Sequence, residues 1–310
     1  MPRFRFSQYL SILFLCATFL VIPAPNSVTA QMTTKVAEQE LPSLLHSLQI
    51  PVYAGEKPMG SQFASLSASS IYIMDRGSGA ILYQKNANAP RYPASTAKMM
   101  TALVARRNYK LDDVLTVKEE AFSTGSTVGL KVGEQLTVAE LLKALLIPSG
   151  NDAAFVLANH HTDGYTGFVK NMNDLAQQLH LSHSEFRNPS GLDNDQQSAT
   201  ARDLAILANE VMKDPVLRAI VDQKFAVAHD VSGLTQHPLN NTNELLAAVD
   251  GVVGIKTGTT TFAGENLITE VDRNGHKVII VMLGSKDRFA EMKQVIDWVY
   301  SNYRWQQIEH

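Results

Sequence analysis

Strand patterns lie at both ends of this 310-residue chain with helix patterns between them, and this arrangement constrains the fold more than any other feature. Near the beginning, apolar runs at 71–73 and 81–83 flank the turn Arg76-Gly77-Ser78-Gly79, which is typical of a β-hairpin. The strands expected near the end cover 252–257, 266–271 and 277–283. We therefore predict a mixed α/β (α+β) fold, in which both ends build one antiparallel sheet flanked by helices and an all-helical insert faces it.

Helix patterns fill the middle of the chain. Ser95–Arg107 contains Met, Ala and Leu with no internal Pro or Gly, and predicts a mostly buried helix that begins at Ser95. Thr137 and Glu140 form a capping box that opens another helix, which Pro148-Ser149-Gly150 interrupts before a second helical run. Further helices are expected over 164–180, 201–213 and 288–303.

The first thirty residues differ from the rest. Arg3 and Arg5 precede the apolar run Tyr9–Ile22, and small and polar residues follow up to Ala30. This pattern predicts a secretory signal cleaved after Ala30. An uncleaved membrane anchor is the alternative, although about 14 apolar residues are fewer than the roughly 20 that a spanning helix needs.

Cysteine content and charge agree with export. Cys16, the only cysteine, lies inside the apolar run, so the mature chain has no thiol and suits an oxidising compartment outside the cytoplasm. The net charge of −3, without long runs of one sign, argues against nucleic acid as a partner. We interpret 31–60 as a linker and 61–310 as one domain without a C-terminal β-domain.

Ser95-Thr96-Ala97-Lys98 places a hydroxyl and an amine three residues apart, which makes them neighbours on one face of a helix. A nucleophile and its base meet in such a pair without help from distant residues. The lysine acts as a base only when it is deprotonated, so the site must lower its pKa by burial and by a second cation nearby. Taken alone, the same residues also fit a capped surface helix.

Two further motifs follow along the chain. Ser149-Gly150-Asn151 lies at the helix break and offers a hydroxyl to relay a proton and an amide to orient a substrate carbonyl or the lysine; alone, a turn and helix cap explains it better. Lys256-Thr257-Gly258-Thr259 ends an expected strand, where Lys and Thr can bind an anionic group and Gly258 lets a substrate backbone lie against the strand edge. Alone, an edge lysine followed by a turn remains an alternative.

The three motifs occur once each, in this order, and each on the element that its role requires. The set resembles the serine-type D-alanyl-D-alanine carboxypeptidases, the low-molecular-mass penicillin-binding proteins, over about residues 60–300. The resemblance implies the penicillin-binding-protein or β-lactamase-like transpeptidase fold. It also includes the segments 93–101, 145–154, 186–192 and 200–205.

The resemblance implies a role for each residue of the first two motifs. Ser95 attacks the carbonyl between two D-alanines and becomes the acyl-ester, while Lys98 accepts its proton. Ser149 passes the proton to the leaving D-alanine, and Asn151 holds the lysine and the substrate amide.

The third motif and a later arginine are implied to bind the substrate. Lys256 supplies positive potential, Thr257 helps to hold the terminal carboxylate, and the backbone N–H groups of Ser95 and Thr259 form the oxyanion hole. Arg288 matches by position the arginine that pairs with that carboxylate, with the first residue of a surface helix as the alternative.

The implied substrates are peptidoglycan peptides ending in D-Ala-D-Ala, with β-lactam antibiotics as covalent inhibitors and no cofactor or metal.

A D,D-endopeptidase that cuts cross-links would use the same residues and stays open. A β-lactamase would need a further carboxylate, but Glu185-Phe186-Arg187-Asn188 does not match the spacing Glu-x-x-x-Asn. A non-catalytic muropeptide-binding module would not require the intact motifs.

Membrane attachment is unsupported, because many relatives carry a membrane-binding helix to which nothing here corresponds.

Other candidate sites are weaker. His160-His161 lacks the partners of a metal site, and Asp193-Asn194-Asp195 lacks the spaced ligands of a calcium loop, so both are interpreted as surface residues. Ser123-Thr124-Gly125-Ser126 is interpreted as a plain turn.

Overall fold

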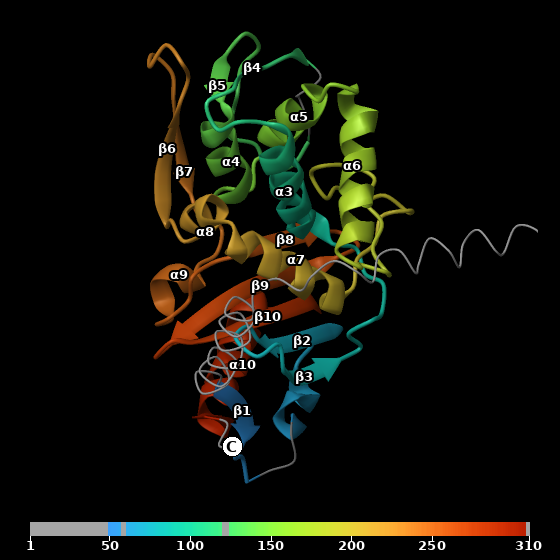
Figure 1. Ribbon diagram of the computed structural model, residues 1–310, viewed down its shortest axis with the longest axis vertical. Coiled ribbons are helices and arrows are strands. Elements are labelled where there is room, and N and C mark those ends of the chain that lie inside the picture. The colour runs from blue at the N-terminus through green and yellow to red at the C-terminus, as the bar shows by residue number, and fades with distance from the viewer. Residues whose placement is uncertain (1–48, 57–59, 120–123, 308–310) are drawn as a thin grey trace, which may run out of the picture. The chain divides into compact units, whose positions relative to one another are not determined.

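The two ends of the chain meet in one sheet. The computed structural model describes residues 49–56, 60–119 and 124–307, and these include a five-stranded antiparallel sheet of order β3-β2-β10-β9-β8 (Figure 1). The strands are β2 Ser70–Asp75, β3 Ile81–Lys85, β8 Lys256–Thr260, β9 Gly264–Arg273 and β10 His276–Ser285. Strands β2 and β10 are neighbours, with Tyr72 opposite Val281. The predicted sheet is therefore confirmed.

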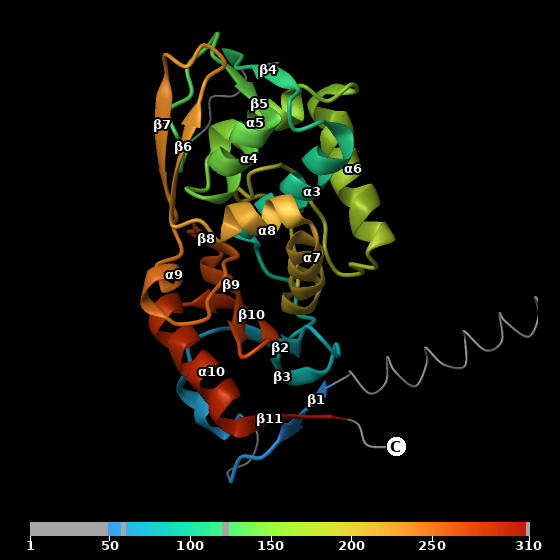
Figure 2. The same ribbon diagram turned by 60° about the vertical axis from the view of Figure 1, so that its left-hand side comes forward.

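Helices cover both faces of this sheet, so its central strands are apolar on both sides. Helix α7 (Ala201–Lys213) contacts β2 and β10, while α10 (Arg288–Asn302) contacts β9 and β10 (Figure 2). Along β10, Ile279 and Val281 belong to the apolar cluster on the α7 side, and Ile280 belongs to the cluster on the α10 side. This alternation follows from the two-residue period of a strand.

The insert between β3 and β8, called the helical lobe below, is mostly rather than entirely helical. Besides α7, its helices are α3 Lys98–Asn108, α4 Val138–Leu146, α5 Asn151–Asn159, α6 Gly164–Gln178, α8 Pro215–Val221 and α9 Leu245–Ala248. Its described residues also contain the hairpins β4–β5 (Val114–Thr116, Gln135–Thr137) and β6–β7 (Phe225–His229, Gln236–Asn240).

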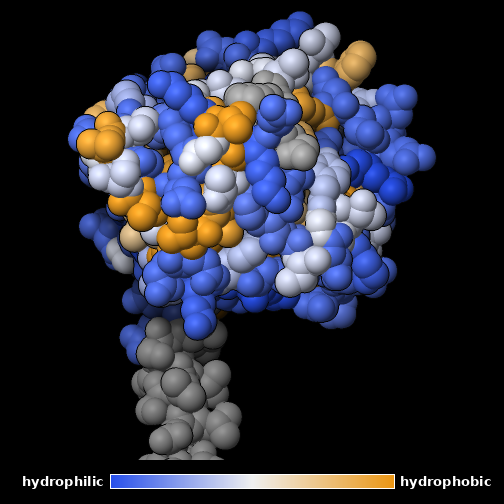
Figure 3. All heavy atoms as spheres, turned by 90° about the horizontal axis from the view of Figure 1, so that it is seen from above, coloured by the Kyte–Doolittle hydropathy of each residue, from blue (hydrophilic) through white to orange (hydrophobic). Residues whose placement is uncertain are grey.

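These hairpins escaped prediction because their strands are short or carry apolar residues at exposed positions as well as buried ones. Val114, Phe225, Val231 and Leu234 are large apolar residues in or between these strands, yet they are exposed. The view from above shows apolar residues scattered in patches among polar ones on this face (Figure 3). A strand signal that depends on one buried and one exposed face is therefore weak here.

Helix starts follow the predicted caps, with one difference beside Ser95. The Oγ1 atoms of Thr137 and Thr200 each accept a hydrogen bond from the backbone N–H three residues later. Helices α4 and α7 therefore begin where expected. The helix predicted to begin at Ser95 instead opens with the 3-10 turn η2 (Ala94–Ala97), and the α-helical part starts at Lys98. Ala94 has φ of +49°, which a continuous helix does not allow.

The strand predicted over 252–257 begins later, at Lys256. Gly251 and Gly254 have φ of +81° and +134°, a backbone region that interrupts regular strand pairing, and Val252 makes only an isolated bridge to Val271. The strand therefore carries the whole Lys256–Thr259 motif at its beginning rather than at its end.

Part of the segment 31–60 is ordered by the other end of the chain. Strand β1 (Gln49–Tyr53) pairs with β11 (Tyr303–Gln307), and the turn η1 (Ser61–Ser65) follows it. The proposed signal and its cleavage position lie outside the described residues. Among the residues that the structure describes, no helix is both long and apolar enough to cross a membrane.

A buried carboxylate joins the segment that leads into β2 to the last helix. Glu291 in α10 accepts hydrogen bonds from the backbone N–H and the hydroxyl of Ser67, from the N–H of Ala68 and from the hydroxyl of Ser285, at 2.6–3.2 Å. Burial alone would raise the pKa of Glu291, but these hydrogen bonds outweigh it and hold the pKa below the ordinary value of a glutamate.

We predict that Glu291→Gln lowers the free energy of unfolding by about 1–3 kcal/mol near neutral pH, because buried donors lose their charged acceptor. The depressed pKa means that ionised Glu291 stabilises the fold above the pKa of the unfolded chain, and that this contribution disappears as the pH falls through the folded-state pKa. Urea denaturation at about pH 7 and about pH 4 should show the difference shrinking. Glu185→Gln, in an exposed ion pair, is the control; an equal loss at both pH values would contradict the assignment.

Candidate active site

Ser95 is held where the edge of the sheet meets the helical lobe. Asn266 in β9 donates from Nδ2 to the carbonyls of Tyr92 and Pro93, at 3.0 and 3.1 Å, and so fixes the segment leading to Ser95. Gly258 in β8 lies so close that a Cβ there would be 2.9 Å from the backbone nitrogen of Ser95. The absent side chain at Gly258 therefore lets β8 itself approach the serine, in addition to any access that it gives to a substrate.

A second glycine closes the other side of this segment. Gly191 has φ of +83°, and a Cβ on it would lie 1.8 Å from the carbonyl oxygen of Ala94. Its N–H donates to Asn188 Oδ1 at 2.7 Å, which fixes the loop in this position. Only glycine satisfies both the backbone conformation and the close approach.

Lys98 is fully buried and makes three polar contacts. Its Nζ lies 2.9 Å from Ser95 Oγ, 2.6 Å from Asn151 Oδ1 and 2.8 Å from the carbonyl oxygen of Ser190. The last two atoms can only accept hydrogen bonds. A neutral amine would donate its two hydrogens to them, and its lone pair would then face the hydroxyl of Ser95.

Electrostatics favour this neutral form. Burial is the largest cause that lowers the pKa of Lys98 well below that of an ordinary lysine, the positive charge of Lys256 lowers it further, and the carboxylate of Asp152 opposes both. The structure therefore brings together the hydroxyl, the amine and the second cation that the sequence motifs predict, without an ion-pair partner within contact of Lys98 among the described residues.

Asn151 is positioned by the loop 124–126, which is more than the plain turn expected there. Its Nδ2 donates to the carbonyl of Thr124 at 2.6 Å, and its backbone N–H donates to the carbonyl of Ser126 at 2.7 Å. Ser123 lies outside the described residues. The loop thus orients the amide so that Oδ1 faces Lys98.

Asp152 fixes the continuation of that loop. Its buried carboxylate accepts the backbone N–H groups of Val128, Gly129 and Leu130 at 3.0–3.2 Å. Neither this aspartate nor the Ser190 carbonyl was predicted to take part, although both lie in segments that carry the family resemblance. Asn266 lies in no motif, so no sequence signal pointed to it.

Ser149 lies on the turn between α4 and α5. It is buried, has φ of +69°, and its Oγ has no hydrogen-bond partner among the described residues. A non-glycine residue in this left-handed conformation costs energy, so the surrounding structure must impose it. Because its Oγ makes no hydrogen bond with a described residue, the hydroxyl is available to a ligand.

The third motif forms a buried cationic edge. Lys256 is 1% exposed and donates from Nζ to the Thr257 carbonyl at 3.1 Å. Burial, and then the charge of Arg288, lower the pKa of Lys256 to about 7. The hydroxyl of Thr257 lies 2.6 Å from that of Thr242.

Arg288, the first residue of α10, extends its side chain to this edge. Its Nη1 donates to the Gly258 carbonyl at 3.2 Å and to the hydroxyl of Thr259, while its backbone N–H donates to Glu265. Burial lowers the pKa of Arg288, against the opposing charges of Glu265 and Glu244. Its Nε is buried without a partner among the described residues, which leaves a donor for a ligand.

A serine beside a buried lysine, at the edge of an antiparallel sheet that carries Lys-Thr-Gly, defines the class of penicillin-recognising serine hydrolases. The family model described as D-alanyl-D-alanine carboxypeptidase matches residues 56–287, and the chain belongs to this family.

Individual relatives agree with the family. The chain is 33% identical over 256 residues to the D-alanyl-D-alanine carboxypeptidase DacF of Bacillus subtilis, a match that covers 76% of this chain and 63% of the relative. It is 34% identical over 252 residues to DacC of Escherichia coli, with coverage of 76% and 61%. The chain thus spans less than two thirds of the length of these curated relatives.

Solved structures share the fold. The Streptomyces K15 DD-transpeptidase superposes with a TM-score of 0.73 and 31% identity, over 76% of this chain and 98% of that one. A penicillin-binding protein homologue from Mycobacterium tuberculosis gives a TM-score of 0.73 at 29% identity, over 80% and 95% of the two chains. These matches confirm the predicted fold class.

We predict that the pKa of Lys98, followed by carbon NMR of its Cε atom, lies well below that of surface lysines and rises in Lys256→Gln, because a neighbouring positive charge is removed. Lys213→Gln, whose lysine forms an exposed ion pair on α7, should leave the Lys98 titration unchanged. An unaltered midpoint in Lys256→Gln would show that the two amines are not coupled.

Proposed function

We propose that this chain is a serine-type D-Ala-D-Ala carboxypeptidase, which hydrolyses the terminal bond of peptidoglycan peptides through an acyl-enzyme on Ser95. The observation that carries the proposal is the set of contacts of Lys98 Nζ. Asn151 Oδ1 and the Ser190 carbonyl oxygen accept its hydrogens, and Ser95 Oγ lies 2.9 Å away. This contact suits transfer of the serine proton to the amine as Oγ attacks the carbonyl carbon.

In this proposal, the negative charge that develops on the carbonyl oxygen is stabilised by the N–H groups of Ser95 and Thr259. The close approach of Gly258 to the Ser95 nitrogen supports this, because it puts the strand beside that amide. Preorganised donors of this kind supply a few kcal/mol of transition-state stabilisation each.

The leaving D-alanine needs both a proton and a carboxylate site. Ser149, whose buried hydroxyl has no partner among the described residues, relays the proton from Lys98 to the leaving amine. The terminal carboxylate is held by Thr257, Thr259 and Arg288. Lys256 adds positive potential to this site. Asn151 orients the substrate amide, and water then hydrolyses the ester at Ser95.

Export of the chain is part of the proposal. The substrate class lies outside the cytoplasmic membrane, and the basic and apolar residues before Ala30 have the pattern of a secretory signal. We place the mature protein in the periplasm or on the cell-wall side of the membrane, with the catalytic domain from about residue 61.

Labelled penicillin tests the catalytic pair. We expect a stable covalent adduct at Ser95, none in Ser95→Ala, and acylation at least about 100-fold slower in Lys98→Ala, because the general base is lost. Lys143→Ala, which removes a partly exposed lysine paired with Glu140, is the matched control and should acylate normally. An acylation rate of Lys98→Ala within a few-fold of the wild type would remove this lysine from its role.

Substrate assays separate the remaining activities. Incubation with a pentapeptide ending in D-Ala-D-Ala should release one equivalent of D-alanine. Cleavage of a cross-linked dimer without cleavage of the pentapeptide would favour a D,D-endopeptidase instead. Rapid turnover of penicillin would favour a β-lactamase, and absence of any adduct would favour a binding module.

A further inference from the structure

An aspartate joins the loop 188–198, called the Asp193 loop below, to the turn between β8 and β9. Asp193 Oδ1 accepts a hydrogen bond from the hydroxyl of Thr260 at 2.6 Å, and its Oδ2 accepts a longer one from the backbone N–H of Phe262 at 3.5 Å. The Thr260 hydroxyl in turn accepts from the N–H of Ala263 at 3.0 Å. Asp193 is thus partly buried and bonded, which corrects its interpretation as a surface residue.

The bond between Asp193 and Thr260 lies close to both walls of the Ser95 segment. Gly191 precedes Asp193 by two residues, and a Cβ on it would lie 1.8 Å from the carbonyl oxygen of the residue before Ser95. Gly258 precedes Thr260 by two residues, and a Cβ on it would lie 2.9 Å from the Ser95 nitrogen. At about 3.3 Å per extended residue, the bond is within about 7 Å of these contacts along each chain segment.

Each wall carries a group that the proposed reaction uses. On the Asp193 loop, the carbonyl of Ser190 accepts a hydrogen bond from Lys98 Nζ at 2.8 Å. On β8, the residue before Thr260 is Thr259, whose N–H belongs to the proposed oxyanion hole. The separation of the two walls therefore determines how Ser95 lies between its base and the N–H that stabilises the developing charge.

Other polar contacts fix the shape of the Asp193 loop itself. Asn188 Nδ2 and Gln197 Nε2 both donate to the carbonyl of Leu192, at 2.9 and 3.0 Å. These bonds stay within the loop, so they do not set its distance from the sheet. Among the described residues, the hydrogen bonds of Asp193 are the ones that join this loop to β8 and its turn.

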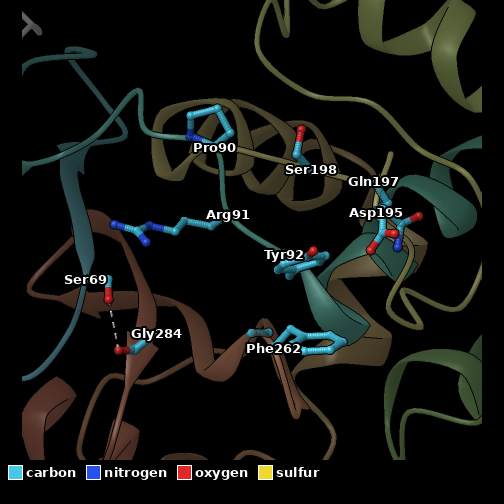
Figure 4. Close-up of a pocket in the computed structure, with 10 residues that line it drawn as sticks. Ser69, Pro90, Arg91, Tyr92, Asp195, Gln197, Ser198, Phe262 and Gly284 are labelled. Carbon is cyan, nitrogen blue, oxygen red and sulfur yellow. Dashed lines mark hydrogen bonds between the residues drawn. The ribbon is translucent and has the colours of Figure 1, made fainter.

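Close packing does not replace these hydrogen bonds. The Asp193 loop and the turn line a pocket of about 340 Å³, with Asp195 and Gln197 from the loop and Phe262 from the turn (Figure 4). Phe262 is 67% exposed, and its ring lies beside that of Tyr92 in the segment before Ser95, with the centroids 5.6 Å apart. The loop and the turn are therefore held together here by Asp193 across an open space.

We propose that Asp193 is a positioning residue for the acylation of Ser95. Through Thr260, it holds the Asp193 loop and β8 at the separation that keeps the Ser190 carbonyl against Lys98. The aspartate itself touches neither the substrate nor the reacting atoms. The inference rests on the proposed function, because it assumes that Ser95 is acylated, and it adds a residue that lies outside the three catalytic motifs.

Loss of the bond has two consequences. The Asp193 loop gains freedom to move away from β8, so acylation slows. Water also gains access to Lys98. Because burial is the largest cause that lowers the pKa of Lys98, its pKa should then rise toward that of an ordinary lysine.

Acylation by labelled penicillin tests the bond as a pair. Asp193→Ala and Thr260→Val each remove it, and each should slow acylation about 10- to 100-fold, because a displacement of about 1 Å near the reacting groups has effects of this order. The double variant should be about as slow as the slower single variant, since both changes remove the same interaction. Asp193→Asn keeps an acceptor for the Thr260 hydroxyl and should restore most of the rate.

Asp195→Ala is the matched control. Asp195 lies two residues further along the same loop, is exposed, and has no hydrogen-bond or ion-pair partner among the described residues, so this variant should acylate at the wild-type rate. Carbon NMR of Lys98 Cε separates positioning from general destabilisation: the titration midpoint should rise in Asp193→Ala and stay unchanged in Asp195→Ala. Urea denaturation establishes that each variant is folded under the assay conditions.

The outcomes are distinct. An unchanged acylation rate in Asp193→Ala, or a slower rate with an unshifted Lys98 midpoint, would overturn the positioning role and leave the carboxypeptidase proposal standing. Multiplied losses in the double variant would show that Asp193 and Thr260 act separately, which also contradicts it. Absence of any adduct in the wild type would instead refute the proposed function.

Discussion

The burial of the Lys98 amino group is the constraint on which the rest of the site depends. A charged amine in this position would need a carboxylate partner, whereas a neutral one needs two acceptors and a proton donor. The acceptors come from Asn151 at the start of α5 and from the Ser190 carbonyl, two segments distant in sequence from Lys98. Each segment must be held accurately. Much of the helical lobe therefore serves to fix Ser95 Oγ, Asn151 Oδ1 and the Ser190 carbonyl oxygen around Lys98 Nζ.

The sheet supplies the rigid half of this arrangement. Strands from both ends of the chain are paired side by side, and Glu291 joins the entering segment to the last helix. Two glycines allow the serine segment to lie against β8 on one side and against the Asn188–Gly191 loop on the other. Substitution of either glycine would move Ser95 relative to Lys98 even though neither takes part in the chemistry.

Local signals in the sequence predicted the elements that local interactions control. The caps at Thr137 and Thr200 are short patterns that act through neighbouring residues, and the three motifs are short patterns that became informative as an ordered set. Other features depend on contacts between residues distant in the sequence, and no short pattern predicts them. They are the hairpins of the helical lobe, the 3-10 turn at Ser95 and the hydrogen bonds from Asn266 to the segment before Ser95. Gly258 was assigned to substrate access, whereas the structure shows that it also packs against the backbone of Ser95.

The left-handed backbone of Ser149 has a consequence for how such a protein can be improved. Glycine or asparagine relieves this conformation at little cost, and either would lack the hydroxyl that the proposed relay uses. Under the proposed mechanism, stability and turnover therefore favour different residues at this position. A variant library screened for heat resistance alone would tend to discard the serine, so thermal selection of this enzyme needs activity as a second criterion.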